Sequence, residues 1–529
     1  MYTPLVTKNR GASPRHINTM MPKKGINREG LPQVMDTNFA LKIKNYIPHD
    51  YGLEKTKGRT KIFERAGANP ITLFKEFTPN VWIFGYSTKV EAYNTSTGTF
   101  TTIKDDFSAN DGFDGARYGD YFFVCNGVEK IYRINDSLAA SVITNSPICS
   151  GLKVIGPRLY AFNLSTDSTA VQYSEVDDGT NPPFDAWSDG VLATQGGIVR
   201  YRNAGTARSV VQLGAFTVVF SDDGFYSFFI NTIDAAGTLN KTEVIQNYTE
   251  DYGGARGAIE TPVGVFYVNE AGLWQMVAVG QTNVPMSRQQ ILTSKKLLGA
   301  SYFKDIDQSN TDLVHDINQN CIFMTGAKDS GFNNVLLGYE MDLGAFFEID
   351  WNISRFAKSG TDVYGASSTS TTAYKLFDGY SDDGQEIGTE YYQEIPLGTL
   401  FNKHALLGLY AGGFLSPSTE LTISFDIYDV DGVLIENKEE YLWTVDANSA
   451  GLEYDEWGSA KWADSAIGGD FDTAGLIESF GGGSPRINNM QRLRVRVTGG
   501  DELRHIINWL SLKTEGKNPI KRRNISQIT

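Results

Sequence analysis

The sequence predicts an all-β protein: a β-propeller of six or seven blades, followed by a C-terminal antiparallel β-sandwich and preceded by an extended N-terminal arm. Three observations support this prediction. The 529 residues include 54 glycines and 12% aromatic residues, which is typical of many short strands joined by tight turns. Hairpin patterns recur seven times along the chain. After residue 384 the spacing of the strand patterns changes, which indicates a second domain.

Each hairpin pattern has a strand rich in aromatic and β-branched residues, a connecting turn, and a second apolar strand. The patterns recur every 37 to 58 residues, beginning at Asn80, Gly119, Gly156, Gly214, Gly264, Cys321 and Asp362. Repeats of about this length, with four short strands each, are typical of propeller blades, which bury their faces only by stacking on one another. A chain of β-sandwiches is the structural alternative, and it predicts a shorter and less regular spacing.

One helix is predicted, over Ser287–Leu298, because Ser287 suits an N-cap and Gly299 ends the apolar stripe. In the C-terminal part, Gln491–Val497 is expected to pair with Ile506–Leu512. The predicted domains are an extended basic arm with the strands that follow it (1–65), the propeller (66–384), the sandwich with a loop insertion at 447–485 (385–515), and a basic tail (516–529).

Charge is distributed unevenly along the chain. The formal net charge is −15, but residues 1–65 hold 13 Lys/Arg against 5 Asp/Glu and residues 513–529 hold 5 against 1. Residues 66–512 therefore carry a net charge of about −27. Such an acidic body excludes a protein that grips DNA over its main surface. The basic ends are either mobile tails or segments that dock on acidic neighbours.

The candidate partner-binding residues are basic and closely spaced: Lys55, Lys57, Arg59, Lys61 and Arg65. From Lys55 to Lys61 they alternate along the chain, which places four of them on one side of an extended strand. An interface with an acidic partner or a neighbouring subunit is the favoured interpretation. A nucleic-acid strip and a charged edge strand that resists aggregation are the alternatives.

No motif singles out a catalytic, cofactor or metal site. Ser221–Gly224 and Ser381–Gly384 approach the Asp-box of sialidase-like propellers, but in both the glycine comes one position early, so we expect turns. Cys125, Cys149 and Cys321 fit neither a metal-binding spacing nor a disulfide framework, and buried reduced thiols are expected. No apolar run approaches the length of a membrane span, and no signal peptide is recognisable. We therefore expect no enzyme activity, no cofactor and no metal.

Four stretches, taken in order, resemble the tail nozzle proteins of podoviruses, also called tail tubular protein B or packaged-DNA stabilisation proteins. They are Asn45–Pro48 with Gly52–Arg59, Tyr173–Gly179 followed by Trp187, Gly272–Trp274 through Val284–Ser287, and Asp378–Gly384. The similarity covers roughly residues 40 to 515 and lies in the order of the patterns. The arm 1–40 and the insertion 447–485 are not covered.

The resemblance implies a structural virion protein of the tail, assembled in the host cytoplasm. It implies a homo-oligomeric ring, usually a hexamer, between portal-side adaptor proteins and distal tail proteins. Double-stranded DNA would pass through the lumen without sequence-specific binding, be retained there and leave at ejection. An acidic wall fits this role because it repels phosphates. The alternatives are a carbohydrate-binding or glycan-degrading propeller and a host adhesion module.

Overall fold

The computed structural model describes part of the chain, and all structural statements refer to that part. It comprises residues 15–20, 24–28, 39–67, 69–108, 112–177, 179, 183–235, 238–249, 257–277, 287–290, 302–307, 311–396, 403–415, 420–428, 434–444, 487–490 and 492–517. The chain divides into two compact units. The propeller-like unit comprises residues 59–341 and 349–378, and the second unit comprises residues 1–58, 342–348 and 379–529.

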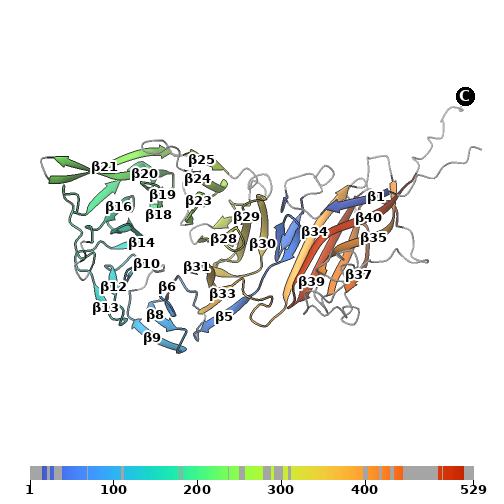
Figure 1. The fold of residues 1–529 in the computed structure, drawn as a ribbon, viewed down its shortest axis with the longest axis horizontal. Coiled ribbons are helices and arrows are strands. Elements are labelled where there is room, and N and C mark those ends of the chain that lie inside the picture. Colours follow the sequence, from blue (N-terminus) through green and yellow to red (C-terminus); the bar gives the residue numbers. More distant parts are fainter. Residues whose placement is uncertain are drawn as a thin grey trace, which may run out of the picture. The chain divides into compact units, whose positions relative to one another are not determined.

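The propeller-like unit consists of small antiparallel sheets that follow one another around a centre (Figure 1). Most of the sheets are built from four consecutive strands, because short β-forming segments alternate with tight turns. The strands of the first three sheets are β6 (Leu73–Thr78), β7 (Val81–Tyr86), β8 (Lys89–Asn94) and β9 (Thr99–Lys104); β10 (Asp114–Tyr118), β11 (Tyr121–Cys125), β12 (Tyr132–Ile134) and β13 (Ala140–Val142); and β14 (Cys149–Ile155), β15 (Arg158–Leu164), β16 (Ala170–Tyr173) and β17 (Gly197–Arg200).

The later sheets continue the series. Their strands are β18 (Ala207–Leu213), β19 (Phe216–Ser221), β20 (Phe225–Ala235) and β21 (Thr238–Thr249); β22 (Ala258–Thr261), β23 (Gly264–Asn269), β24 (Gly272–Val277) and β25 (Ser287–Gln290); β26 (Ile306–Asp307), β27 (Leu313–Asp316), β28 (Cys321–Lys328) and β29 (Val335–Glu340); and β31 (Ile353–Ser359), β32 (Asp362–Ser367) and β33 (Thr372–Leu376). A short 3-10 helix, η1 (Arg202–Ala204), precedes β18.

A strand from the beginning of the unit completes its last sheet. β5 (Arg59–Glu64) lies before β6 in the sequence, yet it pairs antiparallel with β33, so that Thr372 lies opposite Glu64 and Leu376 opposite Arg59. The side chain of Phe63 in β5 is buried. The first and last parts of the unit are therefore joined within one sheet.

The apolar core lies between consecutive sheets. One cluster combines Phe123 of β11 with Leu159 of β15, and the next combines Tyr160 of β15 with Val219 of β19. The second strand of a sheet is consequently buried on both faces, as in β19, where every residue is buried. This explains the continuous apolar runs that the sequence shows at these strands, because a strand covered on both sides has no polar face.

All seven predicted hairpins are confirmed as antiparallel pairs. Six of them consist of the second and third strand of their set, and the remaining one pairs β28 with β29. The residues with positive φ cluster one turn earlier, between the first and second strands. Asn80 there has φ of 77° and Gly214 has φ of 61°. This left-handed region favours glycine and asparagine, which explains why several of the predicted patterns begin on these residue types.

The predicted helix over Ser287–Leu298 is wrong at its start. Residues Ser287–Gln290 form β25, which pairs antiparallel with β24, from Trp274 opposite Gln290 to Val277 opposite Ser287. The open edge of β24 offers backbone hydrogen bonds that local helix propensity does not outweigh. The remaining residues, 291–298, lie outside the described part. No helix within the described ranges is long and apolar enough to span a membrane.

The second unit contains two sheets that combine short strands with several long ones. One contains β1 (Arg15–Met20), β3 (Tyr46–His49), β4 (Gly52–Lys55), β35 (Lys403–Leu415), β38 (Ile487–Met490) and β40 (His505–Lys517). The other contains β2 (Lys42–Lys44), β30 (Ala345–Ile349), β34 (Ile387–Pro396), β36 (Glu420–Tyr428), β37 (Leu434–Thr444) and β39 (Arg492–Asp501). In the first sheet, β1 and β4 pair with β40 from the end of the chain, and in the second sheet β2 pairs with β34.

The predicted pairing of Gln491–Val497 with Ile506–Leu512 is wrong. β39 lies between β34 and β36, so both of its edges are occupied. β40 instead pairs with β35, β4 and β1 in the other sheet. The arm expected over residues 1–40 contains β1. The loop insertion 447–485 and the tail beyond residue 517 lie outside the described residues.

Candidate functional site

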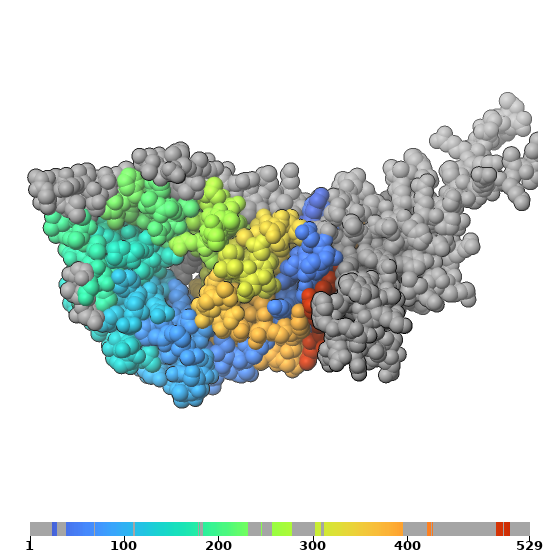
Figure 2. Space-filling view, in the orientation of Figure 1, coloured from blue at the N-terminus to red at the C-terminus, as the bar shows by residue number. Residues whose placement is uncertain are grey.

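The centre of the propeller-like unit holds a polar cavity of about 190 Å³. It is lined mainly by residues of the first strands of the sheets, β6, β10, β14, β18, β22 and β31, and by residues just before β27. In the space-filling view the sheets run in sequence order around a small hollow (Figure 2). Because each first strand faces this centre, the side chains there bring together residues distant in the sequence.

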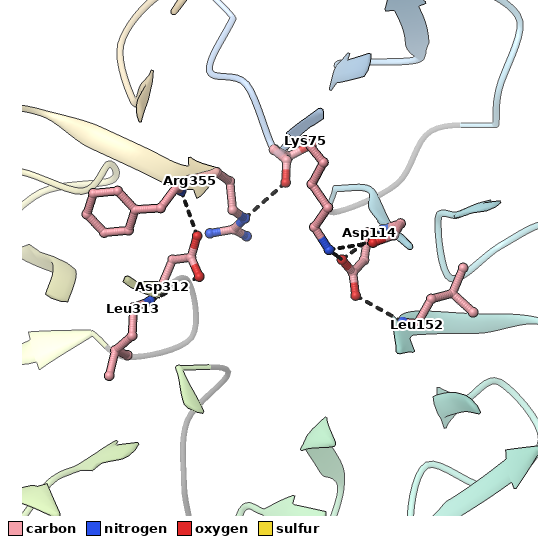
Figure 3. Close-up of polar contacts among 9 residues, drawn as sticks. Lys75, Asp114, Leu152, Asp312, Leu313 and Arg355 are labelled. Atoms are coloured by element: carbon pink, nitrogen blue, oxygen red, sulfur yellow. Dashed lines mark hydrogen bonds and ion pairs between the residues drawn. The ribbon is translucent and has the colours of Figure 1, made fainter. Parts of the chain in front are cut away.

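Lys75 and Asp114 connect the first three sheets (Figure 3). The Lys75 ammonium lies 3.4 Å from Asp114 Oδ1 and donates a hydrogen bond to the carbonyl of Gly115. The other oxygen of Asp114 accepts a hydrogen bond of 2.9 Å from the backbone N–H of Leu152 in β14. One carboxylate thus holds a cation from β6 and a backbone amide from β14.

Asp312 plays the corresponding part between the last sheets. Its Oδ2 accepts a 2.7 Å hydrogen bond from the backbone N–H of Phe356 in β31, and its Oδ1 accepts one of 3.0 Å from Leu313. Arg355 donates from Nε to the carbonyl of Thr72, 3.0 Å away, just before β6. Asp312 lies deep in the unit, and this burial raises the pKa of its carboxyl group although Arg355 acts in the opposite direction.

A third carboxylate repeats the pattern. Glu260 Oε1 in β22 accepts a 2.7 Å hydrogen bond from the backbone N–H of Gln212 in β18. The same oxygen lies 3.1 Å from the ammonium of Lys153 in β14. Asp114, Asp312 and Glu260 therefore share one role, because each accepts a backbone N–H from a different sheet.

This arrangement supports structure more directly than catalysis. A raised carboxyl pKa in a cavity is a general sign of a functional group, but structural networks produce the same shift. Here both oxygens of Asp312 accept backbone hydrogen bonds, which accounts for its position. The cavity volume is also below the 300–1,000 Å³ or so typical of small-molecule sites. Among the described side chains, no group of three or more His, Cys, Asp or Glu residues could hold a metal ion.

No motif in the sequence marks these three carboxylates. Asp114 begins β10, Glu260 lies within β22 and Asp312 immediately precedes β27, so they occupy no common position in their strands. The only signal in the sequence is an acidic residue at or beside a first strand. An acidic chain of 62 Asp and Glu residues supplies many such coincidences.

The five predicted basic residues do not lie along one strand. β4 ends at Lys55 and β5 begins at Arg59, with a break between them. Lys55 and Lys57 belong to the second unit, whereas Arg59, Lys61 and Arg65 belong to the propeller-like unit. The expectation of one extended basic face is therefore wrong. Gly58 lies in this break, and only glycine fits there, because a Cβ would lie 1.7 Å from the carbonyl oxygen of Ser381.

Several of these basic side chains contact the protein itself. Lys55 is 1% exposed and donates a 3.0 Å hydrogen bond to the carbonyl of Leu503. The guanidinium of Arg59 lies over the ring of Tyr374, 4.2 Å from its centroid. Their role in binding a partner stays a prediction.

The last two basic residues of the set, Lys61 and Arg65, also form ion pairs within the protein. Arg65 lies 3.3 Å from the buried carboxylate of Glu91, and Lys61, which is exposed, lies 3.1 Å from Glu64. Lys57 is also exposed. Of the three lysines in the set, Lys57 and Lys61 are therefore exposed, whereas Lys55 is buried.

The other sequence motifs have local structural roles. Ser221–Gly224 forms the turn between β19 and β20, where the N–H of Ser221 donates 2.8 Å to the carbonyl of Gly224. Ser381–Gly384 also forms a turn, with Asp382 N–H 2.7 Å from the carbonyl of Gln385. The three cysteines are free and buried, as expected. Burial, followed by the contact with Cys149, raises the pKa of the Cys125 thiol.

Comparison with known proteins gives no family assignment. No protein-family model matches the chain, and no curated protein does. Among solved structures, it is similar to the computationally designed Ika8 protein, with 10% identity and a TM-score of 0.36 over 60% of this chain and 100% of that one. It is also similar to the extracellular domain of the putative one-component system BT4673 from B. thetaiotaomicron, with 13% identity and a TM-score of 0.41 over 68% and 44% of the two chains. The N-terminal domain of Nup159 gives 11% identity and a TM-score of 0.37 over 64% and 98%. All three TM-scores are below 0.5, so none of these similarities bears on function.

Proposed function

We propose that this protein is a structural component of a short-tailed bacteriophage, a tail nozzle whose copies form a ring that retains packaged DNA and releases it at ejection. In this proposal the propeller-like unit is a seven-bladed propeller. Six blades are the four-stranded sheets, and the seventh is built around β26–β29. The two sheets of the second unit form a β-sandwich. Copies of this fold would make the wall of the ring.

The observation that carries the proposal is the charge distribution. Residues 66–512 have a net charge of about −27, while both ends of the chain are basic. An acidic wall repels the phosphates of a duplex, so that DNA slides past it and is not gripped. The ordered resemblance to tail nozzle proteins supports the same function independently. The carboxylates Asp114, Glu260 and Asp312 fit a rigid building block because they tie neighbouring sheets together.

The size of the central cavity determines where the DNA would pass. A cavity of about 190 Å³ has space for only a few water molecules, each with a share of about 30 Å³ in the liquid. The major groove of a duplex alone is about 12 Å wide, so a duplex does not fit inside one chain. The lumen in this proposal is therefore the space enclosed by several copies.

Electron microscopy of the purified protein in negative stain tests the proposal. We expect rings with a central hole wide enough for a duplex. Gel-shift titration with linear double-stranded DNA should show only weak retention that disappears between low and physiological salt, since any contacts would come from the basic ends. Protein that stays monomeric at every concentration, or that binds DNA tightly at physiological salt, would contradict a nozzle.

A further inference from the structure

A second cavity, here called the seam pocket, lies where the first and last sheets of the propeller-like unit meet. Its volume is about 380 Å³, twice that of the central cavity and within the usual range for small-molecule sites. Its lining comes from three stretches that are distant in the sequence. These are residues 60–62 of β5, five residues between 76 and 95 in the first sheet, and four residues between 359 and 378 in the last sheet.

Two aromatic rings form the apolar side of the seam pocket. The centroids of Trp82 and Tyr364 lie 4.4 Å apart, with the rings tilted by 49°. Trp82 is 3% exposed and stacks on Phe74 behind it, with 5.0 Å between centroids. Tyr364 remains partly accessible. Trp82 is thus fixed by packing, and Tyr364 supplies most of the aromatic surface that a ligand could reach.

Polar side chains held by their neighbours form the rest of the lining. Lys375 lies 3.0 Å from Asp362 and 3.9 Å from Asp378. Ser359 donates a 2.8 Å hydrogen bond to Glu76 across the seam. These contacts orient both hydrogen-bond donors and acceptors before any ligand binds, which lowers the entropic cost of binding.

The ammonium groups of the seam pocket are already paired with carboxylates, Lys375 with Asp362 and Lys61 with Glu64. Its lining includes two ammonium groups, of Lys61 and Lys375, and two carboxylates, of Glu76 and Asp378. The ion pair with Asp362 keeps the pKa of Lys375 above its ordinary value, so the ammonium form persists at neutral pH. An anionic ligand would have to compete with these carboxylates for the ammonium groups, and a cationic ligand would lie beside the two ammonium groups. A neutral ligand that both donates and accepts hydrogen bonds matches the lining better.

We propose that the seam pocket binds a neutral saccharide, with a pyranose ring against Tyr364 and hydroxyl groups bonded to Lys375 and Asp378. Sugar hydroxyls both donate and accept, so they satisfy carboxylates and ammonium groups together. The C–H face of the ring supplies apolar contact with the aromatic side chain. This proposal is independent of the nozzle function, because it concerns one chain and requires no ring.

The position of the seam pocket gives saccharide binding a structural consequence. Residues of β5 and of the last sheet lie on one side, and residues of the first sheet on the other. A ligand that contacts both sides binds only the closed form of the unit. By mass action it therefore raises the stability of that form. Binding should be visible as a higher melting temperature as well as in a direct binding signal.

The experiment uses the full chain and ligand-observed NMR with maltose, lactose and N-acetylglucosamine, together with thermal unfolding. Glucuronate and glucosamine, which carry charges, serve as ligand controls. We expect at least one neutral saccharide to bind with a dissociation constant on the order of 1 mM and to raise the melting temperature, while the charged sugars bind more weakly. If none of the three neutral saccharides binds at about 10 mM, the proposal is wrong.

Variants locate the binding. Tyr364→Leu and Lys375→Met should each weaken binding by about tenfold or more. Tyr121→Leu, which changes a tyrosine on the second strand of a different sheet, should leave it unchanged. The melting temperatures without sugar show whether each variant is folded. Binding that survives in folded Tyr364→Leu and Lys375→Met proteins would place the saccharide elsewhere and overturn the assignment. Ring formation in negative stain is scored separately, so the two proposals succeed or fail independently.

Discussion

The two units of the chain build their sheets in opposite ways. In the propeller-like unit nearly every sheet consists of consecutive strands, and β5 with β33 is the long-range pair that completes the series. In the second unit, strands near the beginning of the chain pair with strands near its end, as β1 and β4 do with β40. One unit therefore depends on many local pairings and one closure, and the other combines two local hairpins, β3–β4 and β36–β37, with several distant pairings.

This difference between the units affects which strand pairings their stability depends on. Closing the short loop of a local pairing costs little conformational entropy, whereas bringing distant strands together costs more. The stabilising contacts of a distant pairing form only when the two strands have met. The pairing of β5 with β33, which closes the propeller-like unit, is a distant pairing like those of the second unit. Substitutions at the closure should therefore cost more than comparable changes elsewhere in the same unit, and they should leave the second unit unaffected.

The largest effect is expected for Phe63→Ala. Phe63 lies in β5, is 4% exposed, and packs against Phe84 and Tyr93 of the first sheet at centroid distances of 4.7 and 4.9 Å. Removal of the ring leaves a cavity between the two joined sheets. We expect the free energy of unfolding of the propeller-like unit to fall by about 3–5 kcal/mol in urea denaturation.

Phe332→Ala is the control, because Phe332 belongs to the same unit but is 42% exposed. It should change stability by less than about 0.5 kcal/mol. In calorimetry, Phe63→Ala should lower the transition of one unit only. Equal shifts of all transitions would show that the two units unfold together and would remove the basis of the comparison.

The same contrast explains which parts of the fold could be predicted from the sequence. The seven hairpins were predictable because each strand and its partner are close in sequence and joined by a recognisable turn. The pairings of β39 and β40 were not, because the period-2 pattern of a strand specifies its faces and leaves its partner open. At Ser287–Gln290 the local pattern favoured a helix, but these residues form a strand that pairs with the free edge of β24.

The site was less predictable than the fold. Asp114 and Asp312 both line the central cavity only because the sheets surround it, and Glu260 reaches the backbone of a neighbouring sheet in the same way. No spacing in the sequence marks these three carboxylates. The seam pocket likewise combines residues 60–62 with residues 359–378 through the closure. The basic stretch was conspicuous in the sequence, but the break at Gly58 divides it between the two units.

An intermediate loss of stability is expected for substitutions of Asp312, which lines the central cavity. Asp312→Ala removes an acceptor for two backbone N–H groups, of Phe356 and Leu313. Each buried donor left without a partner costs about 1–3 kcal/mol, so we expect a loss of about 2–4 kcal/mol in urea denaturation at neutral pH. Asp312→Asn retains one amide oxygen and should cost less.

The pH dependence sharpens this prediction. Burial raises the pKa of Asp312 above its ordinary value of 3.8, so the native state holds this proton more tightly than the unfolded state does. Stability from this group is therefore present below pH 3.8 and is lost as pH rises through the higher native pKa. The stability of the wild type relative to Asp312→Asn should decrease over that window. A relative increase would mean that Arg355 dominates and that the native pKa is lowered.

The smallest effect on stability is expected at Lys57, and it tests the role of the basic stretch in the second unit. Lys57 is exposed, so Lys57→Glu should change the free energy of unfolding by less than about 0.5 kcal/mol. Lys55→Met is the contrast, because Lys55 is buried and donates to Leu503, and its loss should cost about 1–3 kcal/mol. If an acidic neighbour binds this stretch, Lys57→Glu should make assembly fail at a lower salt concentration, since exposed charge pairs are weak and screened. Sedimentation across a salt series measures this directly, with Lys57→Gln separating loss of charge from its reversal. If the wild type, Lys57→Glu and Lys57→Gln assemble identically at every salt concentration, Lys57 belongs to no interface. Lys55 would then have a purely structural role.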